Sequence, residues 1–188
     1  MSAANLTEQL LGFARKGKYT LRPTSLNDVV EKSTRMFMRT KKEITLHKRC
    51  SAKIWNVEVD RGQIEQVLIN LYLNAWHAMP DGGDLYIQTE NVVLSDAYCE
   101  PFEVKGGNYV KLSVTDSGIG MDKEILERIF EPFFTTKKMG RGTGLGLASV
   151  NERVRMLGGR FDIQSRLNQG TNVAFWIPFK SKTDASGP

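Results

Sequence analysis

The sequence predicts an α+β two-layer sandwich, in which a mixed, mostly antiparallel sheet of about five strands is covered on one face by about three helices. Two observations carry this prediction. Apolar residues recur at helical spacing in residues 25–39, 60–79 and 145–157, and they alternate with polar residues in several other segments. The order helix, strand, helix, strands, helix and hairpin is typical of helices segregated on one face of a mixed sheet.

The composition is that of an ordinary globular protein, because 40% of the 188 residues are hydrophobic and 25% are charged. No apolar run approaches the roughly 18 residues of a membrane span, and the first residues lack the basic-then-apolar layout of a signal peptide. The two cysteines are far apart and favour reduced thiols in a cytoplasmic protein, whatever anchor the full-length protein has. The net charge of +5 is scattered, so we expect neither nucleic-acid binding nor direct membrane contact.

The two ends of the chain are expected to lie outside the main domain. Leu6, Leu10 and Phe13 stand at helical spacing in a segment too short to be stable alone. We therefore interpret residues 1–20 as the end of a longer helix. Residues 181–188 form a polar tail that is expected to be disordered, which leaves residues 21–180 as the folded domain.

The first helix of this domain is predicted from its cap and its apolar stripe. Ser25 is a favourable N-cap residue, and Asp28 places negative charge in the first turn. The stripe expected to face the core consists of Val29, Val30, Ser33, Met36 and Phe37.

The helix predicted for residues 60–79 has the clearest pattern in the chain. Asp60 is its N-cap residue, and Gln63 occupies the capping-box position. The apolar face expected to be buried consists of Ile64, Val67, Leu68, Leu71, Ala75 and Ala78.

Five segments alternate between apolar and polar residues and are predicted strands. They are residues 44–47, 85–89, 109–115, 160–165 and 171–177. His47 falls on the polar side of the first and is interpreted as an ordinary strand histidine. A long loop joins the second and third strands, and residues 168–170 supply a hairpin turn between the last two. Asp122 is expected to cap a short helix that ends near Arg128.

Several polar residues admit both a structural and a functional reading. Asn70, Asn74 and His77 follow the edge of the buried face of one helix. They could cap a neighbouring loop, or the amide oxygens could face a cation or a phosphate-bearing ligand. Asp116 ends a predicted strand before two glycines, which indicates either a simple turn or a carboxylate directed into a cleft above the sheet.

Residues 130–150 combine an aromatic cluster, a basic run and three alternating glycines that open into a helix. Such a glycine-rich helix start exposes backbone N–H groups and can bind phosphate, although a flexible loop that merely starts a helix explains this stretch equally well. The spacing excludes a P-loop, and Leu147 stands where a dinucleotide-binding motif needs its third glycine.

Five segments in this order resemble the motifs of sensor histidine kinases. Residues 70–75 (NLYLNA) resemble the N box, 116–120 (DSGIG) the G1 box, 130–134 (FEPFF) the F box and 142–147 (GTGLGL) the G2 box, and a glycine-threonine pair follows at 170–171. The resemblance implies the Bergerat ATP-binding fold of the GHKL superfamily, shared with type II topoisomerases and Hsp90 chaperones. It also implies that residues 21–180 are an ATP-binding catalytic domain and that residues 1–20 are the remnant of a dimerisation and phosphoacceptor helix.

The resemblance also implies roles for individual residues. Asp116 would accept the adenine amino group, with help from a water near Thr171, and Gly118 and Gly120 would let the chain pass beneath the base. Asn74 would give its amide oxygen to the Mg²⁺ that arrives with ATP, with Asn70 nearby. The implied mobile lid spans residues 130–141, and its Lys137, Lys138 and Arg141 would neutralise the phosphates. The implied catalytic residues are Asn70, Asn74, Lys137 and Arg141. The implied nucleotide-binding residues are Asn74, His77, Asp116, Gly118, Ile119, Gly120, Phe130, Thr136, Lys137, Gly142, Thr143, Gly144, Leu145, Gly146, Leu147 and Thr171.

The sequence departs from the pattern at two positions. His77 stands where many relatives carry lysine, and a neutral imidazole is a poorer partner for phosphate. Asn70 stands where the related ATPases carry a glutamate base, and an amide cannot take a proton from water. The second departure argues against a dedicated ATPase and for phosphoryl transfer to another group.

Neither histidine has the context of a phosphoacceptor, because lysine follows His47 and alanine follows His77 instead of an acidic residue. The resemblance therefore implies that the chain transfers the γ-phosphoryl of ATP to a histidine on a dimerisation domain outside this chain, with a response regulator as a further partner. Two alternatives stay open: a degenerate nucleotide-binding module that acts by partner docking, and an ATPase of the same fold.

Overall fold

The computed structural model describes residues 20–102, 104–137 and 143–180. Most of the predicted N-terminal helix remnant and the polar tail lie outside these residues. The described part contains a five-stranded sheet with strand order β2-β4-β5-β7-β6. Its strands are β2 (Ile44–Cys50), β4 (Gly83–Leu94), β5 (Gly107–Asp116), β6 (Arg160–Arg166) and β7 (Gly170–Pro178). Only β2 and β4 run parallel, so the predicted mixed, mostly antiparallel sheet is confirmed.

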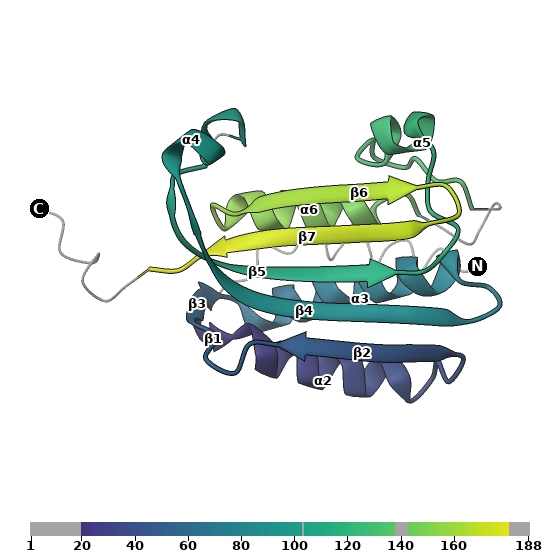
Figure 1. The fold of residues 1–188 in the computed structure, drawn as a ribbon, viewed down its shortest axis with the longest axis horizontal. Helices are drawn as coiled ribbons and strands as arrows, with labels where there is room; N and C mark the ends of the chain where they lie inside the picture. The colour runs from purple at the N-terminus through teal and green to yellow at the C-terminus, as the bar shows by residue number, and fades with distance from the viewer. Residues whose placement is uncertain (1–19, 103, 138–142, 181–188) are drawn as a thin grey trace, which may run out of the picture.

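Three helices cover one face of this sheet, while the other face is largely bare (Figure 1). They are α2 (Leu26–Met38), α3 (Arg61–Ala78) and α6 (Gly146–Met156). The core lies between the two layers, where Leu68 of α3 and Phe175 of β7 are fully buried. The α+β two-layer sandwich predicted from the sequence is therefore confirmed.

The helix caps follow the sequence with one exception. Asp60 accepts a hydrogen bond from the backbone N–H of Gln63 at 3.1 Å, and Asp122 caps α5 (Lys123–Arg128) in the same way. Ser25 occupies the N-cap position of α2, but its side chain makes no capping bond. Ser25 is also the last residue of a strand and pairs with Asn56, so strand pairing rather than its hydroxyl fixes this helix start.

A small second sheet was not predicted. It pairs β1 (Arg22–Ser25) with β3 (Asn56–Val59) in an antiparallel manner. Both strands are four residues long, which is too short for alternation to stand out from the loops around them.

Two further details differ from expectation. Met36 is 60% exposed, and Leu26 and Thr34 are buried on α2 instead; the Thr34 hydroxyl is satisfied by the Val30 carbonyl at 2.7 Å. The long loop before β5 contains the short helix α4 (Asp96–Cys99) and the 3₁₀ helix η1 (Glu100–Phe102).

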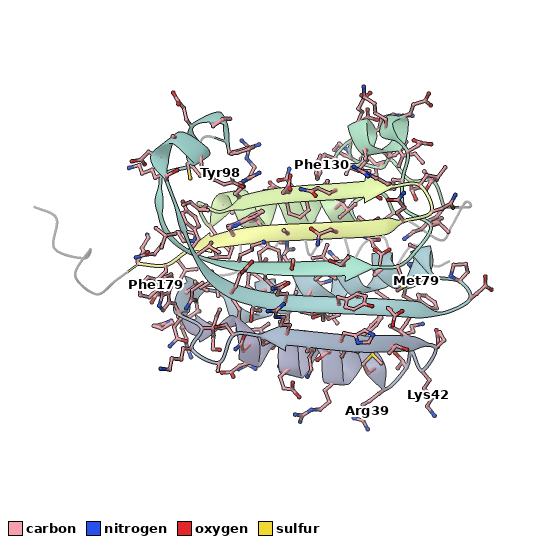
Figure 2. The ribbon with its side chains drawn as sticks, viewed as in Figure 1. Arg39, Lys42, Met79, Tyr98, Phe130 and Phe179 are labelled. Atoms are coloured by element: carbon pink, nitrogen blue, oxygen red, sulfur yellow. The ribbon has the colours of Figure 1, made fainter. Side chains whose placement is uncertain are left out.

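The two ends of the sheet carry different structures. The strand β5 ends on the same side as α5, whereas α4 lies at the opposite end (Figure 1). Figure 2 shows Tyr98 and Phe130 along the same edge of the sheet, with Tyr98 at the α4 end. No helix among the described residues is long and apolar enough to span a membrane.

Candidate functional site

A cavity of about 490 Å³ lies where α3 and the start of α6 meet the ends of β5 and β7. The predicted residues that line it are Asn70, Asn74, His77, Asp116, Ile119, Gly120, Thr136, Lys137, Thr143, Gly144, Gly146, Leu147 and Thr171. The structure therefore brings together side chains that are up to about a hundred positions apart in the sequence, as the motif order implies.

Asp116 lies at the buried end of this cavity and is only 7% exposed. Its carboxylate accepts a hydrogen bond from the Gly118 backbone N–H at 2.9 Å. Burial raises the pKa of Asp116, and the backbone N–H groups of Gly118 and Thr171 oppose this rise. The cavity thus contains a buried carboxylate that has no cationic partner in these contacts, which suits it to accept a hydrogen bond from a neutral donor.

A polar row continues from Asp116 across the neighbouring strands. Asp116 pairs with Thr171 on β7, and Thr171 pairs with Ser165 on β6. Directly opposite residues in antiparallel strands share one face of a sheet. Asp116 and Thr171 both line the cavity, so this part of the row lies on its floor.

The glycines of residues 116–120 pack closely against neighbouring backbone, and Gly120 also lines the cavity. The Ile119 N–H donates to the Ala78 carbonyl at 3.0 Å, and a Cβ on Gly118 would lie 2.6 Å from the same oxygen. Gly120 has φ +63°, and a Cβ there would lie 2.0 Å from the Arg166 carbonyl. Gly118 itself does not line the cavity. The structure thus gives these glycines a role in seating the loop on α3 and β6.

The opposite end of the cavity carries amide and cationic groups. Lys137 donates from Nζ to Asn74 Oδ1 at 3.2 Å, and its Nζ also lies 3.2 Å from Nδ1 of His77. The same Nδ1 contacts the Leu73 carbonyl, and a carbonyl oxygen can only accept a hydrogen bond. Nδ1 therefore carries a proton that it donates to Leu73, and it cannot also accept a hydrogen bond from Lys137. We assign Nδ1–H to the Leu73 bond, which leaves Asn74 as the hydrogen-bond partner of Lys137.

Both ionisable groups at this end are shifted towards their neutral forms. Burial lowers the pKa of Lys137. Burial, followed by the positive charge of Lys137, lowers the pKa of His77, while the Leu73 contact opposes the change. This end of the cavity would therefore gain from a bound anion, which would stabilise the charged form of Lys137.

Asn70 lies one turn before Asn74 and also lines the cavity. Its Oδ1 accepts a hydrogen bond from Gln66 Nε2 at 3.2 Å. No acidic side chain other than Asp116 lines the cavity within the described ranges. The described lining therefore places an amide, and no carboxylate, on this turn of α3.

The segment before the basic run docks on the start of α6. The Phe133 N–H donates to the Gly144 carbonyl at 3.2 Å, and Phe133 itself has φ 70°. Gly144 has φ +67°, and a Cβ there would lie 2.2 Å from the carbonyl carbon of Phe133. Thr143, Gly144, Gly146 and Leu147 line the cavity, whereas Leu145 precedes α6 without being part of the lining.

The three phenylalanines of residues 130–134 have different environments. Phe130 packs edge-on against Phe161, with ring centroids 5.7 Å apart, and does not line the cavity. Phe134 lines it instead, with the Arg128 guanidinium 4.2 Å from the centre of its ring. Lys138, Arg141 and Gly142 lie outside the described residues, as do residues 138–141 of the predicted lid.

Sequence reasoning missed most of the apolar lining, apart from Ile119 and Leu147. The missed residues are Leu71, Leu73, Ala75, Ala78, Val114, Met121, Ile125, Ile129, Phe134, Ile163 and Val173. Val114, Val173 and Ile163 form a row next to the polar row, since they are paired two positions earlier or later on the same strands. The two-residue period of the strands could have placed these three residues in the lining of the cavity.

Comparisons with known proteins agree with this geometry. The family described as "Histidine kinase-, DNA gyrase B-, and HSP90-like ATPase" matches residues 59–181. The chain is 39% identical over 180 residues to the sensor kinase CckA of Brucella abortus (strain 2308), a match that covers 94% of this chain and 19% of that protein. The chain thus spans about a fifth of this relative's length.

Two solved structures are also similar. The catalytic domain of histidine kinase ThkA, in a nucleotide-free form, matches with 31% identity and a TM-score of 0.69 over 84% of this chain and 95% of that one. Histidine kinase ThkA in complex with response regulator protein TrrA matches with 25% identity and a TM-score of 0.69 over 93% of this chain and 46% of that one.

Proposed function

Because the chain belongs to the family of histidine kinase-, DNA gyrase B- and HSP90-like ATPases and carries the ATP-binding catalytic domain of a sensor histidine kinase, we propose that it transfers the γ-phosphoryl of ATP, bound with Mg²⁺, to a histidine on a separate dimerisation domain. The observation that supports this most directly is the polarity of the cavity. A buried carboxylate lies at one end and a lysine next to an amide oxygen at the other.

The base is proposed to bind at the Asp116 end. The adenine amino group donates to the Asp116 carboxylate, and the apolar row of Val114, Val173 and Ile163 packs against the base. Asp116 is suited to this role because its carboxylate is already held by the Gly118 N–H and needs no rearrangement.

The phosphates are proposed to lie between Asn74, Lys137 and the N-terminus of α6. Asn74 Oδ1 already holds a cation, the ammonium of Lys137, so this oxygen also fits Mg²⁺ that brings phosphate and water ligands with it. When bound, Mg²⁺ would neutralise charge on the phosphates. Lys137 would then turn from Asn74 to the phosphates, and the N–H groups at the start of α6 would point at them.

Two observations favour transfer to another protein group over ATP hydrolysis. Asn70 cannot act as a base towards water, and no second carboxylate lines the described cavity. His47 stacks on Tyr86 with ring centroids 4.5 Å apart and is not among the lining residues, and His77 is bonded to its own helix. The acceptor histidine is therefore proposed to belong to a dimerisation domain outside this chain, and the relation to ThkA makes a response regulator the proposed next partner.

The test is phosphoryl transfer from γ-labelled ATP in the presence of Mg²⁺. We expect no label on this chain alone and acid-labile, base-stable label on a separately supplied dimerisation domain. Label on His47 or His77 would contradict the separate acceptor. Binding of ATP without any transfer would favour a docking module, and steady phosphate release that survives Asn70→Ala would favour an ATPase.

A further inference from the structure

The hydroxyl of Ser165 lies at the centre of a hydrogen-bond network beside the proposed base site. Its Oγ donates to the Gly170 carbonyl at 2.9 Å and accepts from the Met121 backbone N–H at 2.9 Å. A third contact, also 2.9 Å, joins it to Oγ1 of Thr171. Ser165 thereby links β6 to the start of β7 and to the end of the loop that follows Asp116.

In the contact between the Ser165 and Thr171 hydroxyls, the number of available protons decides which hydroxyl is the donor. A serine hydroxyl has a single proton, and here that proton is used by the Gly170 carbonyl, which can only accept. The Met121 N–H can only donate. The Thr171 hydroxyl must therefore donate to Ser165, and the Thr171 oxygen keeps only acceptor capacity for anything in the cavity.

The floor of the cavity consequently presents two acceptors side by side. Asp116 and Thr171 are directly paired across β5 and β7, and both line the cavity. An exocyclic amino group can donate to the carboxylate, and a water molecule can donate one proton to the neighbouring ring nitrogen and the other to Thr171. A base with a 6-oxo group would instead place an acceptor against the carboxylate.

We propose that Ser165 is a positioning residue that holds the Thr171 hydroxyl as an acceptor and thereby makes the site selective for adenine over 6-oxopurine nucleotides. The proposal rests on the proposed nucleotide-binding function of this cavity. Without the Ser165 oxygen, the Thr171 hydroxyl can rotate and donate into the cavity. Adenine then loses a preorganised acceptor, while a 6-oxopurine gains a donor.

The test is titration calorimetry of ADP and IDP, each with Mg²⁺, into the chain and four variants: Ser165→Ala, Ser165→Thr, Thr171→Val and the double variant Ser165→Ala/Thr171→Val. The loss of one hydrogen bond corresponds to about a fivefold change in affinity, so we expect Ser165→Ala to lower the ADP-to-IDP preference about fivefold. Ser165→Thr keeps the hydroxyl and should restore the preference. In the Thr171→Val background, Ser165→Ala should leave the preference unchanged, because the hydroxyl that it controls is absent.

Equal weakening of ADP and IDP by Ser165→Ala would show that Ser165 only ties the strands together and would overturn the proposal. An unchanged preference would overturn it as well. Failure of the unmodified chain to bind ADP at all would instead refute the proposed function of the cavity, so the two failures are distinguishable. Thermal unfolding of each variant checks that it is folded before titration.

Discussion

Asp116 has an environment unlike that of an exposed aspartate, because its side chain is almost fully buried. Burial raises its pKa above the ordinary value of 3.8, and only backbone N–H groups oppose this. A carboxyl whose pKa is higher in the folded state holds its proton more tightly there. Its contribution to stability is therefore present below the unfolded-state pKa and is lost as the pH rises through the folded-state pKa.

The first prediction follows from this loss of stability with rising pH. Between about pH 4 and neutrality, the free energy of unfolding of the nucleotide-free chain should fall by an amount that the Asp116→Asn variant does not show. Urea unfolding of both proteins at a series of pH values measures the difference. The exposed Asp81→Asn variant is the control for loss of one carboxylate. Parallel pH curves for the chain and Asp116→Asn would contradict the raised pKa.

Residue positions in the cavity were predictable where a motif fixed them. Asp116, Asn74 and Lys137 line it as expected, because a strand end, a helix face and the segment that follows the phenylalanines each follow from local sequence. Phe130 was the predicted phenylalanine of the site, whereas Phe134 is the one that lines the cavity. This difference was not predictable, because contacts with Phe161 and Arg128 decide which ring turns inward. Ser165 was missed because its importance lies in a three-way hydrogen-bond network.

Among the elements, α2 and α3 begin in physically different ways. Asp60 accepts a hydrogen bond from the Gln63 N–H and another from the Thr20 N–H, whereas the Ser25 side chain makes no capping bond. Only one of these two helix starts therefore depends on its N-cap side chain.

The second prediction compares these two caps. Asp60→Ala should lower the free energy of unfolding by about 1 kcal/mol, the usual loss for an N-cap, while Ser25→Ala should change it by less than about 0.5 kcal/mol. Urea unfolding of both variants measures the difference. Equal losses would indicate that Ser25 caps α2 in solution.

The third prediction concerns the junction of the phenylalanine segment with α6. At Gly144, an added Cβ would strike the Phe133 backbone in a conformation that favours glycine, whereas at Gly146 the nearest atom would be Asn74 Nδ2 at 3.7 Å. Gly144→Ala should therefore lower thermal stability and weaken ADP binding together. Gly146→Ala is the matched control and should keep the fold intact. An unaltered Gly144→Ala protein would exclude the docked arrangement of this segment.

Element types were predicted well by periodicity because the long strands and helices each bury one face. The sheet β1–β3 and the helices α4 and η1 escaped prediction because each is only three or four residues long. Their positions are set by partners distant in sequence, as in the pairing of Ser25 with Asn56.

At the scale of the whole molecule, a second cluster of side chains, near α4, is separate from the nucleotide cavity. The buried guanidinium of Arg160 lies 3.5 Å from the centre of the Phe102 ring, with Trp176 and Tyr98 also around it, and its Nε has no hydrogen-bond partner. None of these residues lines the cavity, and Figure 2 shows Tyr98 at the α4 end of the sheet.

The fourth prediction tests this separation. Arg160→Ala should destabilise the chain by about 2 kcal/mol and raise hydrogen exchange in residues 95–102, because several cation–π contacts are lost. Arg160→Lys should recover only part of the loss, since lysine lacks the planar group that stacks on the rings. The ADP affinity of the folded protein should stay within about twofold in both variants. A large change in affinity would mean that the two sites are coupled.

Calorimetric titration of ATP into the chain, with and without Mg²⁺, tests whether the cavity is a magnesium-dependent adenine nucleotide site. We predict one site whose affinity falls at least about tenfold in Asp116→Asn, and whose enhancement by Mg²⁺ is lost in Asn74→Ala and kept in Asn70→Ala. Absence of binding, or an affinity that neither Asp116→Asn nor Asn74→Ala alters, would show that this cavity is not the nucleotide site.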